Sequence, residues 1–322
     1  MRAIVVRELG GPEVLAIGER DDPQPKPGEL VVKVAAAGVN FMDTYQRSGI
    51  GAYKAQTPYT PGAEGAGTVL AVGEGVTEFA VGDPVAWAGG PGSYAEQVAL
   101  PAANAVPVPH GFDLKIAAAV MLQGMTAHYL CNSTFPVQEG NITVVHAAAG
   151  GVGLLLTQMI KRRGGVVIAT TSTTAKALLA QRMGADHVTS YDEFGEAVRR
   201  ISGERGASVV FDGVGKATFE ASLAALRPRG MMVLYGAASG PVPPFDPQRL
   251  NSGGSLFLTR PTMAHYIADR AELLWRAGEL FEWLAKGELD IRIGGEDPLA
   301  DARRAHDDLA GRRTTGKLLL IP

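Results

Sequence analysis

Short runs of alternating apolar and polar residues, separated by glycine and proline, fill the first third of the chain. The apolar runs are AIVVREL, ELVVKVAAAGV, GAGTVLAVG, GDPVAWAG and YAEQVAL, and the segments between them include PQPKPGE, TPYTPGAEG and PVPHG. Many short strands with turn residues between them indicate a compact β domain, barrel-like or sandwich-like.

The pattern changes near Lys115. A helical segment, KIAAAVMLQGMTAHYLC, is followed by the strand-like runs NITVVHA, GVVIATT, HVTSY, SVVFDGV, RGMMVLYGA and GSLFLTR, and helical segments lie between most of them. Strands that alternate with helices of this length predict βαβ units and a parallel sheet covered on both faces. The predicted fold class is therefore α/β, with a Rossmann-type doubly wound parallel sheet domain beside a mainly β domain.

The chain beyond Pro261 does not continue this alternation. It contains an amphipathic helix over roughly 269–286 and ends in the strand-like run KLLLIP. We expect this tail to return to the first domain. The predicted division is a catalytic β domain of residues 1–121 and 263–322, a nucleotide-binding domain of residues 122–262, and a cofactor in the cleft between them.

Composition removes several classes of function. Thirty basic residues against 33 acidic ones give a net charge of −3 in 322 residues, which offers no electrostatic reason to expect nucleic acid or an anionic membrane. Cys131 is the only cysteine, so an internal disulfide and a thiolate-rich zinc site are excluded. The apolar stretch of residues 144–160 is short and broken by glycine, and no signal-peptide pattern precedes it. We expect a cytoplasmic protein.

The segment VVHAAAGGVGLLLTQ, residues 144–158, joins an apolar strand to an amphipathic helix through small residues. Such a turn offers the N–H groups of a helix N-terminus to a pyrophosphate. Gly150 and Gly151 let the backbone approach the ligand, Val152 belongs to the apolar helix face, and Gly153 permits close packing of helix on strand. Ala148 stands where G-x-G-x-x-G has its first glycine, and we expect it to widen the turn slightly. A tight structural turn without a ligand is the alternative.

The second strand of this series indicates which nucleotide is bound. NAD-binding turns have an acidic residue there for the ribose 2′-hydroxyl, but no carboxylate occurs between residues 153 and 186. Hydroxyl residues occupy positions 172–174, and Lys176 follows at once. A lysine can pair with a 2′-phosphate, so the sequence favours NADPH. The alternative for Lys176 is a solvated lysine on a helix face.

Three segments together resemble a known family. HAAAGGVGLLLTQ, AAAGVNFMDTYQRSG and RRTTGKLLLIP are similar to quinone oxidoreductases of the zeta-crystallin type, zinc-free members of the medium-chain dehydrogenase/reductase superfamily with a GroES-like β domain. The resemblance runs from end to end of the chain. Zinc enzymes of that superfamily have a histidine where this chain has Ala63, and cysteines where it has Asn40 and Gln123. Without zinc no Lewis acid ionises an alcohol.

The resemblance also implies roles for individual residues. Glu64 we expect to bond its own glycine-rich loop, and Asp43 to be a positioning acceptor rather than a base. Tyr45 and Tyr53 have the alternative reading of half-buried structural tyrosines. The implied site residues are Asn40, Asp43 and Tyr45 near the nicotinamide, Tyr53 at the mouth of the cleft, Ser172, Lys176 and Tyr191 on the 2′-phosphate, Arg312 as a further cofactor-binding residue, and Tyr235 as an aromatic near the cofactor.

The predicted reaction is zinc-independent hydride transfer from the nicotinamide C4 of NADPH to a quinone or similar conjugated carbonyl, with the proton from water or a tyrosine. Reduction of an activated alkene, such as an enal or enone, is the nearer alternative because fold does not fix substrate. A lens structural or RNA-binding role, known among similar zeta-crystallins, is the distant one. GSLFLTR should form a sheet edge that pairs with a second subunit, so the resemblance implies a homodimer.

Overall fold

The computed structural model of the protein describes residues 1–50, 54–90 and 92–322. The chain forms two compact units, which we call unit 1 (Met1–Met125 with Ile267–Pro322) and unit 2 (Thr126–Tyr266). The polypeptide thus leaves unit 1 once and returns to it. The binding and catalytic roles expected of the two domains stay predictions.

In the part of the chain that the structure describes, no helix is both long enough and apolar enough to cross a membrane.

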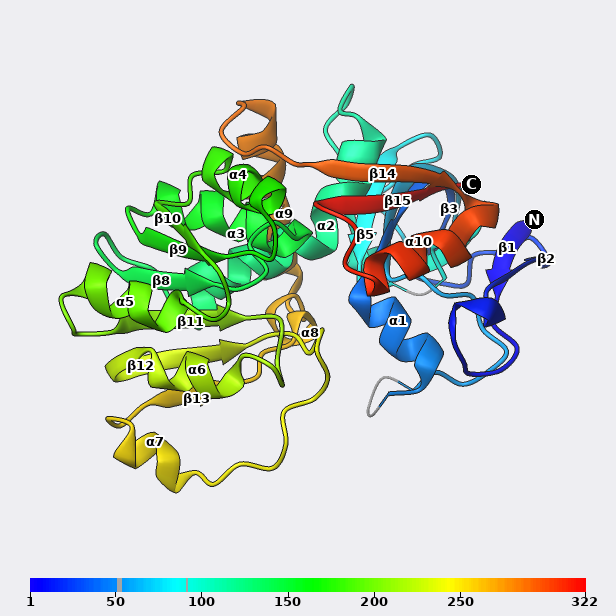
Figure 1. The fold of residues 1–322 in the computed structure, drawn as a ribbon. Helices are drawn as coiled ribbons and strands as arrows, with labels where there is room; N and C mark the ends of the chain where they lie inside the picture. Colours follow the sequence, from blue (N-terminus) through cyan, green and yellow to red (C-terminus); the bar gives the residue numbers. More distant parts are fainter. Residues whose placement is uncertain (51–53, 91) are drawn as a thin grey trace. The chain divides into compact units, whose positions relative to one another are not determined.

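Unit 2 is built on a six-stranded parallel sheet in the order β10-β9-β8-β11-β12-β13, which can be followed in Figure 1. The predicted α/β architecture is therefore confirmed. The strands are β8 (Ile142–Val145), β9 (Val166–Thr170), β10 (His187–Thr189), β11 (Ala207–Asp212), β12 (Leu226–Leu234) and β13 (Phe257–Thr259). The helices are α3 (Gly151–Arg162), α4 (Thr174–Arg182), α5 (Phe194–Ser202), α6 (Phe219–Ala224), α7 (Gln248–Ser252) and α8 (Met263–Tyr266).

The strand order of unit 2 reverses at β8. The chain runs outward from β8 to β9 and β10, and then crosses to β11 on the other side of β8. Such a reversal opens a crevice at the carboxyl ends of the two central strands, where ligands of open parallel sheets bind. The glycine-rich turn follows β8 directly, so the topology brings it to this point. The central strands are apolar on both faces, and Val144, Val210 and Met232 are fully buried.

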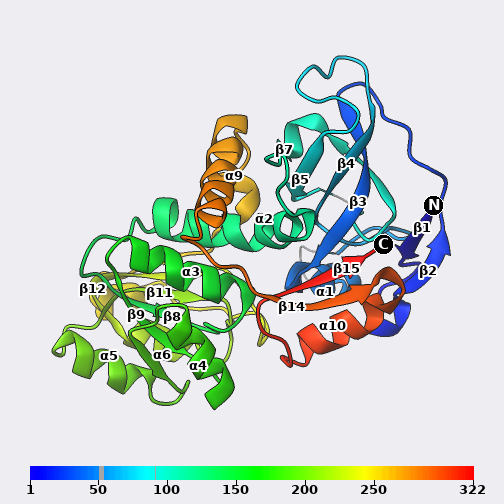
Figure 2. The same ribbon diagram turned by 90° about the horizontal axis from the view of Figure 1, so that it is seen from above.

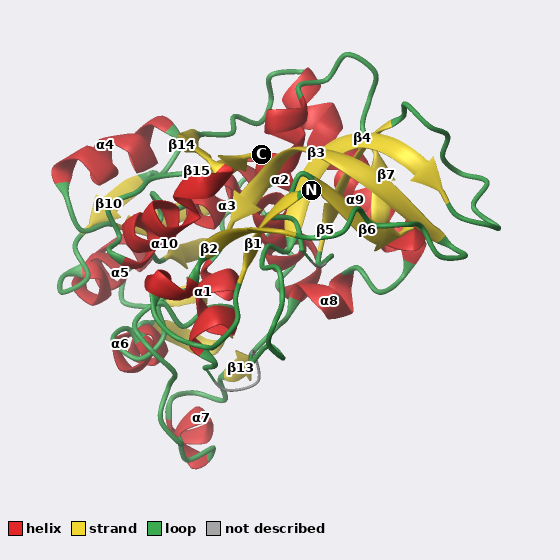
Figure 3. Cartoon of the chain, turned by 90° about the vertical axis from the view of Figure 1, so that its right-hand side faces the viewer, coloured by secondary structure: helices red, strands yellow, loops and turns green. Residues whose placement is uncertain are grey.

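Unit 1 is built on a mixed sheet in the order β14-β15-β3-β4-β5-β7, with β6 paired to β3. A separate antiparallel ribbon joins β1 to β2 (Figure 3). The strands are β1 (Arg2–Val5), β2 (Ala16–Glu19), β3 (Glu29–Val39), β4 (Glu64–Val72), β5 (Pro84–Ala88), β6 (Gln97–Pro101), β7 (Ala105–Pro107), β14 (Ile293–Pro298) and β15 (Lys317–Ile321).

The last strand of the chain pairs with one of the first. β15 runs antiparallel to β3 with Leu319 opposite Gly38, and β3 pairs on its other side with β4. The helices are α1 (Phe41–Ser48), α9 (Arg270–Ala285), α10 (Ala302–Ala310) and the first part of α2 (Leu114–Tyr129), whose last four residues belong to unit 2. Helix α10 lies beside β14 and β15 (Figure 2). Because β15 lies next to β3, residues from the two ends of the sequence meet at the N-cap of α1.

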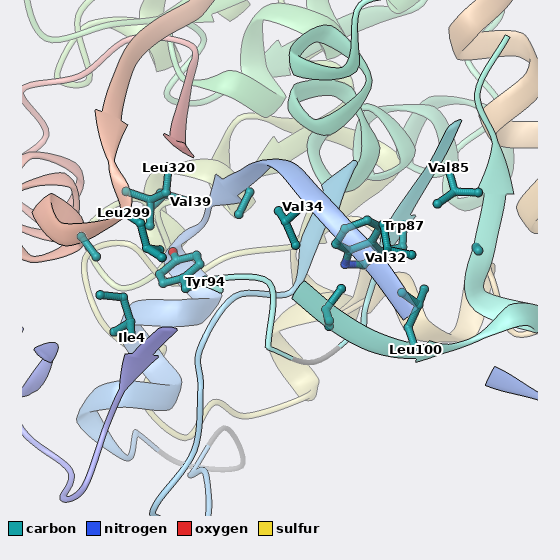
Figure 4. Packing of buried hydrophobic residues seen from close by; sticks show 14 of the residues in the cluster. Ile4, Val32, Val34, Val39, Val85, Trp87, Tyr94, Leu100, Leu299 and Leu320 are labelled. Carbon is teal, nitrogen blue, oxygen red and sulfur yellow. The ribbon is translucent and has the colours of Figure 1, made fainter. Parts of the chain in front are cut away.

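The core of unit 1 fills the space between these strands (Figure 4). Trp87 and Leu100 are fully buried beside Val32, whereas Tyr94 lies near Leu299 and Leu320 at the other end of the cluster. Tyr94 carries a polar hydroxyl into this apolar cluster, and a buried hydroxyl requires a hydrogen-bond partner. Its partners belong to the polar cluster described below.

Candidate functional site

The glycine-rich turn of unit 2 has the geometry of an anion-binding helix start. Gly150 is the N-cap of α3, and the first intrahelical bond runs from Leu154 N to Gly150 O at 2.9 Å. The N–H groups of the preceding first turn have no intrahelical acceptor, and a glycine N-cap has no side chain to offer them. They are the donors that a pyrophosphate requires, so the residues present fit a dinucleotide.

Close packing explains Gly153. A Cβ built on Gly153 would lie 2.6 Å from the carbonyl oxygen of Ala147 and 2.7 Å from the Cα of Ala148. Both neighbours are backbone atoms, so no side chain can move aside. A Cβ on Gly150 would come only within 3.2 Å of the Ala147 oxygen. Gly153 therefore sets the distance between α3 and the turn, whereas the sequence predicted close packing of the helix on the strand.

The strained residue of the turn is Ala147, whereas its neighbour Ala148 was expected to alter the turn. Ala147 has φ of +51°, in the left-handed region that favours glycine. Ala148 is buried, and its N–H donates to Thr170 O at 3.1 Å, so it ties the turn to β9. The carbonyl of Ala147 accepts from Gly150 N at 2.9 Å, which closes the turn.

Tyr191 reaches the same turn from the loop after β10. Its hydroxyl accepts a hydrogen bond of 3.1 Å from the N–H of Ala147. Its ring stacks on His146, with 5.8 Å between ring centroids and 26° between ring planes. His146 is buried between Thr170 Oγ1 and Ser222 Oγ, each 2.9 Å from one ring nitrogen. Burial lowers the pKa of His146 to about 4, so the imidazole is neutral in the fold.

The segment after β9 presents hydroxyl groups and no carboxylate. Ser172, Thr173 and Thr174 are exposed, and Lys176 is half-buried in the first turn of α4. The hydroxyl of Thr173 accepts a hydrogen bond of 3.3 Å from Lys176 N and caps helix α4. Ser172 lies between this cap and the end of β9. The segment itself offers hydroxyl groups and a cation and contains no carboxylate, which fits the 2′-phosphate of NADPH.

Asp212 is a buried carboxylate that sequence reasoning missed. It ends β11 and accepts from Val214 N at 2.7 Å, Gly215 N at 2.9 Å and the hydroxyl of Thr218 at 2.6 Å. Tyr235 N donates to the backbone oxygen of Asp212 at 2.9 Å, and burial raises the pKa of the Tyr235 hydroxyl well above its usual value. Asp212 thus shapes the loop in which Tyr235 lies. An acidic residue after an apolar strand and before Gly-Val-Gly was the available signal.

Unit 1 contains a buried ion pair between strands β15 and β4, and a residue that follows β3 is hydrogen-bonded to both partners. Lys317 Nζ on β15 contacts Glu64 Oε1 on β4, and both side chains are fully buried. Asn40, after β3, donates from Nδ2 to Glu64 Oε1 at 2.6 Å and accepts at Oδ1 from Lys317 Nζ at 2.9 Å. Glu64 Oε2 accepts from Leu122 N at 2.7 Å. Burial lowers the pKa of Lys317 below its usual value, and the nearby Asp43 carboxylate opposes that shift.

The expectation for Glu64 is therefore wrong. Glu64 begins strand β4 and bonds side chains of β15 and of the β3–α1 junction, not its own glycine-rich loop. The misreading has a physical cause: the partner Lys317 lies 253 residues away, and only the pairing of β15 with β3 brings it near. Sequence reasoning missed Lys317 altogether.

Asp43 organises the start of α1. It accepts from Asn40 N at 2.8 Å and from the hydroxyl of Tyr94 at 2.9 Å. Tyr94 Oη lies 3.1 Å from His306 Nε2 on α10. Burial raises the pKa of Asp43 to about 6 and lowers that of His306 to about 3, so His306 is neutral. Asp43 thus accepts two hydrogen bonds, and its role as a positioning acceptor for catalysis stays a prediction.

The other predicted residues are more exposed or lie outside the described part. Tyr45 is half-buried on α1, with its ring centroid 6.3 Å from that of Phe41. Arg312 is exposed in the turn after α10, and its φ is +55°. Tyr53 lies outside the described residues. The structure thus brings Asn40 together with Asp43, and Tyr191 together with the glycine-rich turn.

Metal-ligating side chains do not gather in the described part of either unit. Among residues 1–50, 54–90 and 92–322, no three His, Cys, Asp or Glu residues form a group that could hold a metal ion. In the same part of the chain Gln123 Oε1 is buried without a hydrogen-bond partner.

Two family models match the chain. The model described as an alcohol dehydrogenase GroES-like domain matches residues 26–110, and the one described as a zinc-binding dehydrogenase matches residues 151–272. The first match lies in unit 1, and the second covers most of the unit 2 sheet.

Relatives of the chain match it along nearly its full length. The quinone oxidoreductase of Pseudomonas aeruginosa is 44% identical, with 97% of each chain covered. A 2-haloacrylate reductase of a Burkholderia species is 39% identical and covers 99% of this chain and 98% of its own. A mycobacterial protein solved in complex with NADPH is 48% identical, with a TM-score of 0.97 and complete coverage of both chains.

Proposed function

Because this chain belongs to the quinone oxidoreductase family of the medium-chain dehydrogenases and reductases, we propose that it is an NADPH-dependent oxidoreductase that reduces quinones. The observation that supports NADPH as the cofactor is the carboxylate-free segment after β9, where Ser172 and Lys176 follow a dinucleotide-type turn. The solved mycobacterial relative with NADPH supports the same choice.

Each part of unit 2 has a role in holding the cofactor. The first turn of α3, over Gly151–Gly153, donates its N–H groups to the pyrophosphate. Ser172, Lys176 and Tyr191 bind the 2′-phosphate, and the Tyr191 hydroxyl also accepts a hydrogen bond from the backbone of the turn. Tyr235 lies in the loop shaped by Asp212 and faces the cofactor, and Arg312 also binds the cofactor.

When bound, NADPH supplies a hydride from nicotinamide C4, so the acceptor gains two electrons and takes one proton from water or a side chain. Asn40, Asp43 and Tyr45 belong to the acceptor site, as does Tyr53. Asp43 holds the first turn of α1 in place because its carboxylate accepts a hydrogen bond of 2.8 Å from the backbone N–H of Asn40. These residues contribute placement, which fits an acceptor that is already electrophilic.

A second function has its own support. The 2-haloacrylate reductase is 39% identical along nearly the whole chain, and the haloacrylate in its name is an activated alkene. Hydride addition to the β-carbon of an enone or acrylate uses the same donor and the same fold, with the proton delivered to the α-carbon.

The test follows nicotinamide oxidation with NADPH and NADH in parallel, using a simple quinone and an enone as acceptors. We expect NADPH-dependent quinone reduction. Oxidation of NADPH with the enone but not with the quinone would identify the protein as an alkene reductase instead. Tight NADPH binding without reduction of either acceptor would contradict the acceptor assignment and leave the cofactor assignment standing.

We also propose a homodimer formed along β13. This strand is at the edge of the unit 2 sheet, and Phe257 on it is 55% exposed. An apolar sheet edge is normally paired or covered. Sedimentation velocity at micromolar concentration should give a dimer for the wild type and a monomer for Phe257→Lys. Leu178→Lys on α4, where the leucine is 52% exposed, is the matched control and should stay dimeric. A monomeric wild type would refute the proposal.

A further inference from the structure

Asn40, Glu64 and Lys317 form a closed ring of three hydrogen bonds. Glu64 Oε1 accepts from both Lys317 Nζ and Asn40 Nδ2, and Asn40 Oδ1 accepts from Lys317 Nζ at 2.9 Å. This ring fixes the orientation of the Asn40 amide. A half-turn of the amide would place its oxygen against a carboxylate and its nitrogen against an ammonium, and both contacts are repulsive.

The backbone leaves space for this ring at one residue. Gly38 on β3 faces the ion pair, and a Cβ built there would lie 2.3 Å from Glu64 Oε1 and 2.5 Å from Lys317 Cε. The pair therefore sits directly against the β3 backbone, two residues before Asn40. Three strands contribute to the site, with β4 and β15 on either side of β3.

Stability alone does not account for an ion pair in this position. Removing an ammonium and a carboxylate from water carries a large desolvation penalty, and well-packed apolar residues at such positions are often equally stable or more so. Here both groups are fully buried, and Glu64 accepts three hydrogen bonds. What the pair brings about is the fixed orientation of one neighbouring amide.

That amide retains one donor. The side chain of asparagine has two N–H groups, and one of them is held by Glu64 at 2.6 Å. The other faces the carbonyl of Gly38 at 3.5 Å, a distance at which a hydrogen bond is weak. A stronger acceptor placed beside Asn40 would take this N–H.

We propose that Asn40 donates this N–H to the carbonyl oxygen of the acceptor, and that Lys317, with Glu64, is the positioning residue that holds the amide in the donating orientation. The inference rests on the proposed function. As the hydride and its electron pair leave nicotinamide C4 and bond to the acceptor, the acceptor oxygen becomes an enolate or hydroquinone monoanion. The Asn40 N–H stabilises this oxyanion, and one proton from water then completes the product.

Lys317→Met alone would leave Glu64 buried without its cation, and such a variant risks not folding. The test therefore uses Lys317→Met/Glu64→Gln, which removes both charges together. We expect kcat to fall about tenfold or more, with the KM for NADPH unchanged. The same pair of substitutions is then made in an Asn40→Ala background, where it should lower kcat no further because Lys317 acts through Asn40.

A matched control exists in the same unit. Lys115 and Glu296 form an exposed ion pair at 2.5 Å, and Lys115→Met/Glu296→Gln makes identical substitutions away from Asn40. It should leave kcat at the wild-type value. A wild-type kcat in Lys317→Met/Glu64→Gln would overturn the proposal. A loss of kcat that multiplies with that of Asn40→Ala would overturn it as well.

A second readout separates this inference from the proposed function. If the wild type reduces neither quinone nor enone, the proposed function fails, but the orientation of the amide can still be measured. The side-chain ¹⁵N–¹H pair of Asn40 is identified by its absence in Asn40→Ala. In the wild type one of its two hydrogens should exchange slowly, and this protection should be lost in Lys317→Met/Glu64→Gln. Unchanged protection would show that the ion pair does not position Asn40.

Discussion

The backbone N–H of Ala147 donates a hydrogen bond of 3.1 Å to the hydroxyl of Tyr191, 44 residues later in the chain. This contact supports the one residue of the glycine-rich turn that is held in the left-handed region, with φ of +51°. A residue in that conformation is strained, and it persists only where its surroundings fix it. Tyr191 is part of that support, so it can influence nucleotide binding through the backbone of the turn.

Tyr191→Phe should therefore weaken both the fold and the nucleotide site. The variant keeps the ring on His146 but removes the acceptor of Ala147 N, which costs about 0.5–1.5 kcal/mol of unfolding free energy. Urea denaturation measures that loss, and the Kd of NADPH should rise as the turn loosens.

The control for Tyr191→Phe is Ser202→Ala. It removes a side-chain acceptor from Gly206 N, a bond of 2.9 Å just before β11 begins. That end of the strand is opposite to the turn. Ser202→Ala should cost similar stability and leave the Kd of NADPH unchanged. Equal Kd values for both variants would show that Tyr191 supports the fold only.

Lys176→Ala should distinguish the two nicotinamide cofactors. Loss of a charge-assisted bond to the 2′-phosphate should weaken NADPH binding by about 1.5–3 kcal/mol and hardly affect NADH. Isothermal titration with each cofactor measures the difference. Arg200→Ala, which removes an exposed cation at the end of α5, should alter neither affinity. If both cofactors lost the same affinity, Lys176 would not recognise the phosphate.

Gly153→Ala should disturb the start of α3. The added Cβ meets backbone atoms at 2.6 and 2.7 Å, so the helix itself must shift. We expect a loss of about 1–3 kcal/mol of unfolding free energy together with weaker NADPH binding. Gly195→Ala in α5 is the control, because a Cβ there meets nothing within 4 Å. It should be neutral or stabilise the protein by up to about 1 kcal/mol. Tolerance of Gly153→Ala would contradict the close packing.

His146 should make the protein less stable in acid. Its pKa falls from 6.5 in the unfolded chain to about 4 in the fold, so between these values only the unfolded state binds the proton. The contribution of neutral His146 to the free energy of unfolding is fully present above pH 6.5. It is lost as the pH falls towards 4, by about 3 kcal/mol in all. His306 acts in the same direction and Asp43, whose pKa is raised, in the opposite one.

Comparison with a variant isolates the contribution of His146. Unfolding free energies between pH 6.5 and 4 should decline less steeply in His146→Gln than in the wild type, by about 1.4 kcal/mol per pH unit. His187→Gln, at an exposed position, should keep the wild-type slope. Parallel slopes for all three proteins would mean that His146 does not remain neutral in the fold.

The sequence by itself determined the α/β class and the nucleotide turn. Both depend on short-range patterns: the alternation of apolar runs with amphipathic helices, and the spacing of Gly150 and Gly153 after an apolar strand. The absence of a carboxylate between residues 153 and 186 is also visible in the sequence, and it sufficed to favour NADPH. Local patterning carries such features because each residue acts on neighbours a few positions away.

Only the tertiary structure decided the surroundings of Asn40. Glu64 looked like part of a glycine-rich loop, and Lys317 had no predicted role beyond its place in the strand-like run KLLLIP. Their pairing spans 253 residues and requires β15 to lie beside β3 in one register, with Gly38 leaving space between them. No spacing along the chain encodes a contact of that kind. It follows from strand order, and strand order is settled by packing of the whole unit.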